Sequence, residues 1–304
     1  MAVKPGNKSF SRGKPESVVA KKMVLRKPNK LIQAKVSRLR KKRVDKGQLA
    51  SQRLQKILAA SGLGSRREME VLIHNGQVKI NGKQAQLGDR VNPSDEVKVK
   101  GKVVVLHFPD RLPRIVLYHK REGEIVSRSD PQGRISVFDR VPMIQKSQQW
   151  ICIGRLDINT TGLLVFTTSG DLVNRFSHPR YRIDREYRVR VNGQLTEEQL
   201  TVILTEGIEL EDGLAKVVQI NALTQPGEMP KNFWYQLVLQ EGKNREVRRL
   251  FQYFGLTVSK LVRIRFGPIA IPPRLRLGQY YELNELEVEY VLKEMGMGNY
   301  LKNN

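Results

Sequence analysis

Regular apolar periodicity begins only at Gln52, and this limits which part of the 304-residue chain can fold. Residues 1–49 are rich in Lys, Arg, Pro, Ser and Gly, so they cannot bury enough surface to offset the entropy lost on ordering. We expect a disordered basic arm there, with an organellar transit peptide as the alternative, because the segment is poor in acidic residues. The length of the chain predicts two domains besides this arm.

The charge of the chain indicates a polyanionic partner. The sequence has 54 Lys and Arg against 30 Asp and Glu, a net charge of +24, of which +14 lies in the first 50 residues. Both the arm and the remainder are therefore basic, which favours association with nucleic acid. A solubilising surface is the alternative explanation.

The segment from Gln52 to Val105 predicts a small module of two helices and a sheet. Leu54, Ile57 and Leu58 have helical spacing, and Gly62 and Gly64 end that helix. The sequence Ser65-Arg66-Arg67-Glu68 has the form of a capping box that starts a second helix, which ends at Asn75-Gly76. Asn81-Gly82 then predicts a hairpin turn, and alternating valines from Val97 to Val105 extend the sheet.

A second, larger domain is predicted from about Pro113 to Met295. Its apolar patterns alternate between strand-like and helical segments, which favours an α+β fold with a mixed, largely antiparallel sheet. The expected strands are Ile115–His119, Trp150–Ile153, Leu163–Thr168, Tyr187–Val191, Trp234–Leu239 and Lys260–Phe266, and the expected helices are Gly170–Phe176, Thr196–Leu204, Arg245–Phe254 and Glu285–Met295.

The densest polar signal is the segment Gly154–Val165, GRLDINTTGLLV, a loop between two apolar strand-like runs. Such a loop holds Asp157 on a rigid frame beside Arg155. A loop aspartate is commonly only a turn former, so residue type alone does not make Asp157 catalytic.

Two resemblances change this interpretation. The sequence RLQKILAASGLGSRREMEVLIHNGQVKING, from Arg53 to Gly82, resembles S4-type RNA-binding domains. The Gly154–Val165 motif, with TTSGDL, REY, GKNREVRRL and LVRIRFG following in order, resembles the RsuA/RluB/RluE/RluF family of ribosomal RNA pseudouridine synthases. They imply an S4-type domain over residues 50–110 and a pseudouridine synthase catalytic domain over 111–295. The basic arm expected over 1–49 is not part of the family's common pattern, and a tail is expected over 296–304.

The family resemblance also implies roles for individual residues. Asp157 would be the catalytic carboxylate, Tyr187 would pack on the flipped uracil, and Arg155 would take the place of that base or pair with the neighbouring backbone. Arg248 would pair with Asp157, with Arg249 as the less favoured candidate. Alternation in the strand near the C-terminus leaves Leu261, Arg263 and Arg265 on the face available to RNA. Leu261 would contact the base there and Arg263 a phosphate, while the basic face of the S4-type domain would present Arg53, Lys56, Arg66, Arg67 and Lys79 to RNA.

The resemblance of the segments 244–249 and 261–267 to the large-subunit members implies a single uridine in the peptidyl-transferase region of 23S rRNA, free or in a large-subunit assembly intermediate. Another 23S uridine, a 16S target, a non-catalytic assembly factor and an RNA hydrolase or glycosylase are the alternatives. The four histidines lack metal-ligand spacing and no phosphate-binding loop is present, so we expect neither metal nor cofactor. We also expect a cytoplasmic monomer without a membrane segment, with its one cysteine, Cys152, as a core thiol.

Overall fold

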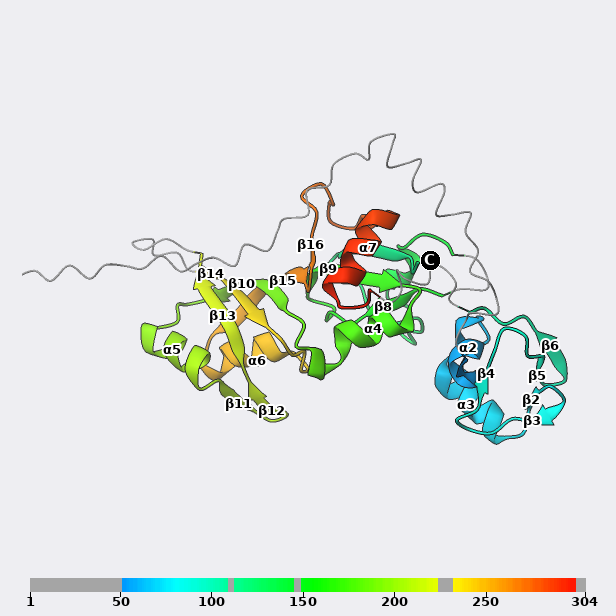
Figure 1. Cartoon of the computed structure of the whole chain (residues 1–304). Coiled ribbons are helices and arrows are strands. Elements are labelled where there is room, and N and C mark those ends of the chain that lie inside the picture. Colours follow the sequence, from blue (N-terminus) through cyan, green and yellow to red (C-terminus); the bar gives the residue numbers. More distant parts are fainter. Residues whose placement is uncertain (1–50, 109–111, 145–148, 224–231, 299–304) are drawn as a thin grey trace, which may run out of the picture.

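The computed structural model describes residues 51–108, 112–144, 149–223 and 232–298. The arm expected over residues 1–49 lies outside these ranges, as do residues 299–304 of the expected tail. The described residues form a small N-terminal unit and a larger one, with separate hydrophobic cores (Figure 1).

The small unit has the helix pair and hairpin that its sequence predicts. Ser65 and Glu68 form the capping box at the start of the second helix, with Ser65 Oγ accepting from the Glu68 amide at 3.2 Å. Asn81 and Gly82 both have positive φ angles, 49° and 83°, as a tight hairpin turn requires. The elements are β1 (Gln52–Arg53), α2 (Leu54–Ala60), α3 (Arg66–His74), β2 (Val78–Ile80), β3 (Lys83–Gln84), β4 (Arg90–Val91), β5 (Val97–Val99) and β6 (Lys102–Val104).

The larger unit is built on a nine-stranded sheet with the order β13-β14-β10-β15-β9-β7-β17, to which β8 and β16 add at β9 and β15. Every pairing is antiparallel except that of β15 with β9, so the predicted α+β class with a mixed, largely antiparallel sheet is confirmed. The strands are β7 (Ile115–Lys120), β8 (Ile151–Ile153), β9 (Thr161–Thr167), β10 (Arg185–Asn192), β13 (Val217–Ala222), β14 (Asn232–Leu239), β15 (Thr257–Phe266), β16 (Ile269–Ala270) and β17 (Tyr280–Glu282), and β11 (Ile208–Leu210) with β12 (Gly213–Ala215) forms a separate hairpin.

Four helices cover the sheet on opposite faces. Helices α4 (Gly170–Ser177) and α7 (Glu285–Glu294) pack with β7 and β9 in one core. Helices α5 (Glu197–Thr205) and α6 (Glu246–Tyr253) pack in the other core, against the opposite face of the sheet at β10 and β14. Figure 1 shows α4 and α7 beside β8 and β9, and α5 and α6 beside β10, β13 and β14.

The one parallel pairing joins the two halves of the sheet at a very close backbone contact. Val262 and Arg263 of β15 lie beside Thr161 and Gly162 of β9. A Cβ atom on Gly162 would lie 2.6 Å from the Arg263 nitrogen and closer still to its carbonyl oxygen, and the φ angle of Gly162 is +111°. Only glycine therefore fits at the point where the segment after Asp157 meets β15.

Candidate active site

Asp157 lies on a short loop between two paired strands. β8 and β9 are antiparallel neighbours, with Ile153 opposite Val165, so residues 154–160 are held at both ends. The Thr160 amide donates to the Asp157 carbonyl at 3.0 Å, which closes a turn over the aspartate. Leu156 is buried in the core beneath the loop, whereas the Asp157 side chain is 35% exposed. The carboxylate thus faces outward from a fixed backbone.

Lys120 holds this loop from below. Its side chain is 0% exposed, and its Nζ donates to the carbonyls of Thr160 at 2.9 Å, Ile158 at 3.3 Å and Arg121 at 2.9 Å. Burial lowers the pKa of Lys120 to about 8, against the opposing pull of nearby carboxylates. Lys120 is not among the residues predicted from the sequence, although a lysine at the end of the apolar run of β7 is a signal that could have identified it.

Two arginines at the start of α6 contact different atoms of the same loop. Arg245 Nη1 lies 3.8 Å from Asp157 Oδ2. Arg248 instead donates from Nη2 to the Asn159 carbonyl at 2.9 Å and from Nη1 to the Val258 carbonyl at 3.0 Å. The expectation that Arg248 forms the ion pair with Asp157 is therefore wrong for this structure. Arg248 is occupied by backbone carbonyls, and the nearer guanidinium is that of Arg245.

The backbone at the start of α6 explains why Arg245 reaches the carboxylate. Arg245 has a left-handed conformation with φ +47°, unusual for a residue with a side chain. The next residue, Glu246, is buried and accepts from the Lys243 amide at 3.0 Å, which fixes the turn, and burial raises the pKa of Glu246. Arg249 points elsewhere, with its Nη2 2.7 Å from Asp212 Oδ1.

Apolar side chains form the wall beside the loop. Tyr187 of β10 is 9% exposed and shares a core with Leu156 and Leu261. Leu261 lies opposite Val189 in the β10–β15 register, so it is two residues along the sheet from Tyr187. Tyr187 and Leu261 thus share one core with Leu156 of the Asp157 loop, and Tyr187 is mostly buried there.

Arg263 does not lie where the alternation of β15 placed it. It is 2% exposed, donates from Nε to the Leu163 carbonyl at 2.9 Å, and places its guanidinium 4.7 Å from the centre of the Phe266 ring. The expected phosphate contact is contradicted, because the face that carries Leu261 and Arg263 is turned into the core. Arg155, by contrast, is exposed on the loop, two residues before Asp157.

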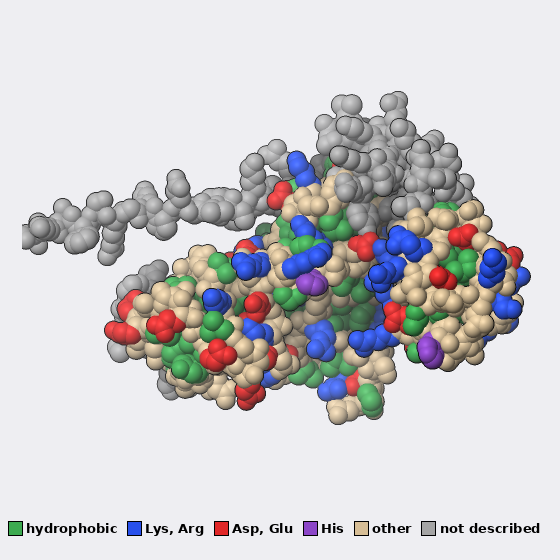
Figure 2. Space-filling model, turned by 60° about the horizontal axis from the view of Figure 1, so that its bottom comes forward, with side chains coloured by type: hydrophobic (Ala, Val, Ile, Leu, Met, Phe, Trp, Pro, Cys, Tyr) green, Lys and Arg blue, Asp and Glu red, His purple; other side chains and the backbone are tan. Residues whose placement is uncertain are grey.

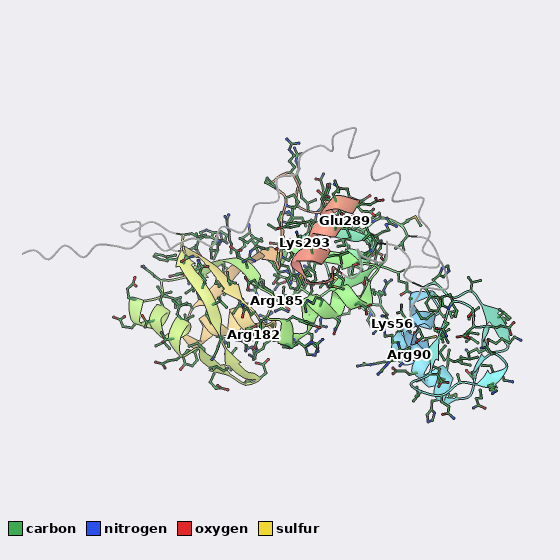
Figure 3. The ribbon with its side chains drawn as sticks, in the orientation of Figure 1. Lys56, Arg90, Arg182, Arg185, Glu289 and Lys293 are labelled. Carbon is green, nitrogen blue, oxygen red and sulfur yellow. The ribbon has the colours of Figure 1, made fainter. Side chains whose placement is uncertain are left out.

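The basic residues predicted on the small unit are mostly exposed. Arg53, Arg66, Arg67 and Lys79 lie at the surface. Lys56 is half-buried, and its Nζ forms an ion pair at 2.8 Å with Asp171 at the start of α4, which links the two units. Figure 2 shows Lys and Arg side chains gathered along the hollow between the units, and Figure 3 shows Lys56 and Arg90 on the side of the small unit nearest to the larger one.

Other features of the described residues bear on the chemistry. Burial raises the pKa of the Cys152 thiol to about 12, so this half-buried cysteine is a poor nucleophile. In the described part of the chain no three His, Cys, Asp or Glu side chains are grouped closely enough to hold a metal ion. None of the helices described is both long and apolar enough to cross a bilayer.

Comparisons with known proteins identify two regions. A family model described as RNA pseudouridylate synthase matches residues 114–253, and an S4 domain model matches residues 52–97. The chain is similar to proteins named ribosomal large subunit pseudouridine synthase B from three organisms. The Haemophilus influenzae protein is 41% identical over 300 residues, with 97% of this chain and 83% of that protein covered.

For the Escherichia coli K12 protein the identity is 44% over 244 residues, with 79% of this chain and 82% of that protein covered. The Pseudomonas aeruginosa protein is 47% identical over 247 residues, and the match covers 81% of this chain but 63% of that longer protein. A solved structure titled as a pseudouridylate synthase has a TM-score of 0.53 at 23% identity, with 78% of this chain and 98% of that chain covered. This structural likeness shows the fold.

Proposed function

Because the chain belongs to the family of RNA pseudouridylate synthases, we propose that it converts one uridine of large-subunit ribosomal RNA to pseudouridine with Asp157 as its catalytic carboxylate. The relatives named as large-subunit synthases support ribosomal RNA as the substrate class. The observation that carries the role of Asp157 is its position. It is the carboxylate on a loop fixed by Lys120 and Arg248, beside the wall formed by Tyr187 and Leu261.

The reaction requires a carboxylate and little else from the protein. The glycosidic bond between N1 and C1′ breaks, the uracil turns, and C5 forms a bond to C1′. The proton on C5 is then lost and N1 gains one, so the product is an isomer of the substrate. An ionised Asp157 can attack the sugar or base covalently or accept a proton from the ribose. Arg245 attracts the carboxylate from 3.8 Å and thereby orients it.

The surroundings of Asp157 fit the extraction of a base from folded RNA. Removing a base from its stack costs roughly a few kcal/mol. Arg155, which is exposed on the same loop as Asp157, would occupy the vacated position. The small part of Tyr187 that stays exposed would supply a contact for the flipped uracil. The exposed basic residues of the S4 domain, Arg53, Arg66, Arg67 and Lys79, would bind the RNA backbone and hold the substrate.

The target position and the assembly state are finer parts of the same proposal. The sequence resemblance favours one uridine in the peptidyl-transferase region of 23S rRNA, free or in a large-subunit assembly intermediate. We also propose that the enzyme acts as a cytoplasmic monomer, which sedimentation of the purified chain with and without RNA would test.

The role of Asp157 is tested by release of tritium from RNA labelled at C5 of uridine, because this hydrogen leaves during the reaction. Asp157→Asn should abolish release, while Asp212→Asn, which removes an exposed carboxylate paired with Arg249, should leave it unchanged. Mapping of pseudouridine in 23S and 16S rRNA from cells that lack the protein, complemented with either variant, identifies the position. Full activity of Asp157→Asn would overturn the proposal, and an unchanged map would favour an assembly factor.

A further inference from the structure

One face of the sheet carries a basic and aromatic surface that the proposed reaction does not use. In β10, Val189 and Val191 point into the core with α5 and α6, so Arg188 and Arg190 point to the opposite face. Arg188 is exposed and Arg190 is half-buried. The active-site residues Tyr187, Arg245 and Arg248 lie on the α6 side, so this surface lies behind the active site.

The register of the strands groups these side chains into two rows. Arg190 lies opposite Trp234 of β14 on one side and Lys260 of β15 on the other. In the next row, Arg188 lies between Gln236 and Val262. Asn221 of β13 continues this row beyond Gln236, and both Asn221 and Lys260 are exposed. We call these seven residues, Arg188, Arg190, Asn221, Trp234, Gln236, Lys260 and Val262, the rear sheet surface.

The contacts within the rear sheet surface hold an aromatic ring next to a cation. The Arg190 guanidinium lies 5.9 Å from the centre of the Trp234 ring, and its Nε donates to Ser259 Oγ at 3.0 Å. Trp234 is half-buried, whereas the other tryptophan, Trp150, is buried. An indole partly open to solvent and braced by an arginine is suited to stacking against a nucleobase.

The charge of the rear sheet surface is positive. The carboxylate of Glu186, at the end of the two rows, forms an ion pair with Arg265 and accepts a hydrogen bond from Gln236. Among the described residues, the ion pairs found leave Arg188, Arg190 and Lys260 without a carboxylate within 4.0 Å. Three cations with an aromatic ring and amide groups match the phosphates, bases and base edges of RNA.

We propose that the rear sheet surface binds a single-stranded segment of RNA, separate from the uridine held at Asp157. A sheet face that no helix covers can present side chains to the unstacked bases of single-stranded RNA. The bases of a duplex are not accessible to such stacking. This inference rests on the proposed function, since the segment bound would belong to the same ribosomal RNA. A second anchor behind the active site would let the enzyme hold partly unfolded RNA while one base is modified.

The first test uses Trp234 as its own reporter in the full chain. A short oligocytidylate is the probe, because it contains no uridine and cannot react. We expect it to quench the fluorescence of the wild type and of Trp150→Phe, but to leave that of Trp234→Phe unchanged. Absence of quenching in Trp150→Phe overturns the proposal, as does equal quenching by polyglutamate, which would indicate an acidic protein as the partner.

The second test separates local binding from net charge. The triple variant Arg188→Gln, Arg190→Gln and Lys260→Gln should reduce the slope of log affinity against log salt for oligocytidylate by about 2, since each lost phosphate contact contributes about 0.7. The matched control Arg274→Gln, Arg276→Gln and Lys293→Gln removes the same charge from exposed positions elsewhere and should leave the slope unchanged. Trp234→Ala should weaken binding about tenfold. Equal slopes in the two triple variants overturn the proposal.

Activity measurements distinguish this inference from the proposed function. The rear-surface triple variant should retain the single-turnover rate of tritium release at saturating ribosomal RNA, and Asp157→Asn should retain oligocytidylate quenching. If Asp157→Asn is inactive and the triple variant binds oligocytidylate normally, only the rear-surface proposal fails. If Asp157→Asn is active, the proposed catalytic role fails whatever the rear surface binds.

Discussion

Arg245 and Asp157 lie 3.8 Å apart, while Arg248, less than one helical turn further along, reaches the backbone of the same loop at Asn159. The two arginines therefore act on different parts of the loop. Arg245 interacts with the charge of the carboxylate, and Arg248 fixes the carbonyl that follows it.

Substitution should separate these two actions. Arg245→Gln removes the charge beside Asp157, and we expect kcat to fall about tenfold, or ~1.4 kcal/mol, with little change in Tm. Arg248→Gln removes two hydrogen bonds from a charged donor, and it should lower the free energy of unfolding by about 1.5–3 kcal/mol as well as kcat. Arg245→Lys should recover part of the rate. Normal activity of Arg245→Gln, with a stable but inactive Arg248→Gln, would instead support the pairing that the family resemblance implied.

Lys120→Met should loosen the catalytic loop without touching the substrate. The carbonyls of Thr160 and Ile158 lose their buried donor, so we expect the free energy of unfolding to fall by about 1–3 kcal/mol and kcat to fall with it. Lys293→Met, at an exposed position on α7, is the control and should behave as wild type. Urea unfolding and tritium release measure the two effects. A stable and fully active Lys120→Met would show that the loop does not depend on this lysine.

The stability difference between wild type and Lys120→Met should depend on pH. Burial lowers the pKa of Lys120 to about 8 from an ordinary value of 10.5. Between these values the unfolded chain binds a proton that the folded chain does not, so the contribution of Lys120 to the free energy of unfolding rises with pH. The advantage of the wild type in urea unfolding should therefore widen between pH 8 and 10.5. If it narrows instead, the carbonyls stabilise the ammonium more than burial disfavours it.

Gly162→Ala should disrupt the junction of the two half-sheets. The added Cβ would meet the backbone of Arg263, which cannot move without separating β9 from β15. We expect a loss of about 3 kcal/mol or more in the free energy of unfolding, together with loss of activity. Gly88→Ala is a matched control, because Gly88 has a similar positive φ, +101°, but nothing within 4 Å of an added Cβ. Comparable losses in both variants would mean that backbone conformation, not the close contact, makes glycine necessary at residue 162.

Arg263→Met tests whether Arg263 is a core residue or an RNA contact. If Arg263 is a core residue, its loss should lower Tm through the missing hydrogen bond to Leu163, while the salt dependence of RNA binding stays the same. A salt slope reduced by about 0.7 to 0.9 with unchanged Tm would restore the phosphate contact that the sequence suggested.

The sequence predicted most of the fold because its local signals agree with its final structure. The capping box at Ser65, the Asn81-Gly82 turn and the periodicity of α6 all depend on residues close together in the chain. Strand β13 was missed because its buried residues, Val217 and Ile220, are not spaced two apart. A register shift between Val217 and Gln219 interrupts its alternation.

The errors in the candidate site have a similar physical cause. Alternation in β15 assigned Leu261, Arg263 and Arg265 to one solvent-facing side, but Leu261 and Arg263 are buried. A register shift in the pairing with β10 puts Arg265 opposite Glu186, on the other face from Arg263. The ion pair of Asp157 depends on the left-handed backbone at Arg245, which no spacing in the helix that follows reveals. Lys120 was missed because it contacts the carbonyls of the loop after β8 only when the fold brings that loop to the end of β7.

Asp157 and the arginines that contact its loop lie far apart in the sequence. This separation determines the order in which the small domain and the catalytic loop can form during synthesis. Asn159 and Arg248 are separated by 89 residues, whereas the small domain is closed by contacts within residues 51–108. Because a chain emerges from its N-terminus and folds domain by domain, the small domain is complete long before α6 is made. The S4 domain of a nascent chain therefore folds first, and the catalytic loop is completed late. A fragment that stops before α6 would contain the S4 domain but not the completed catalytic loop.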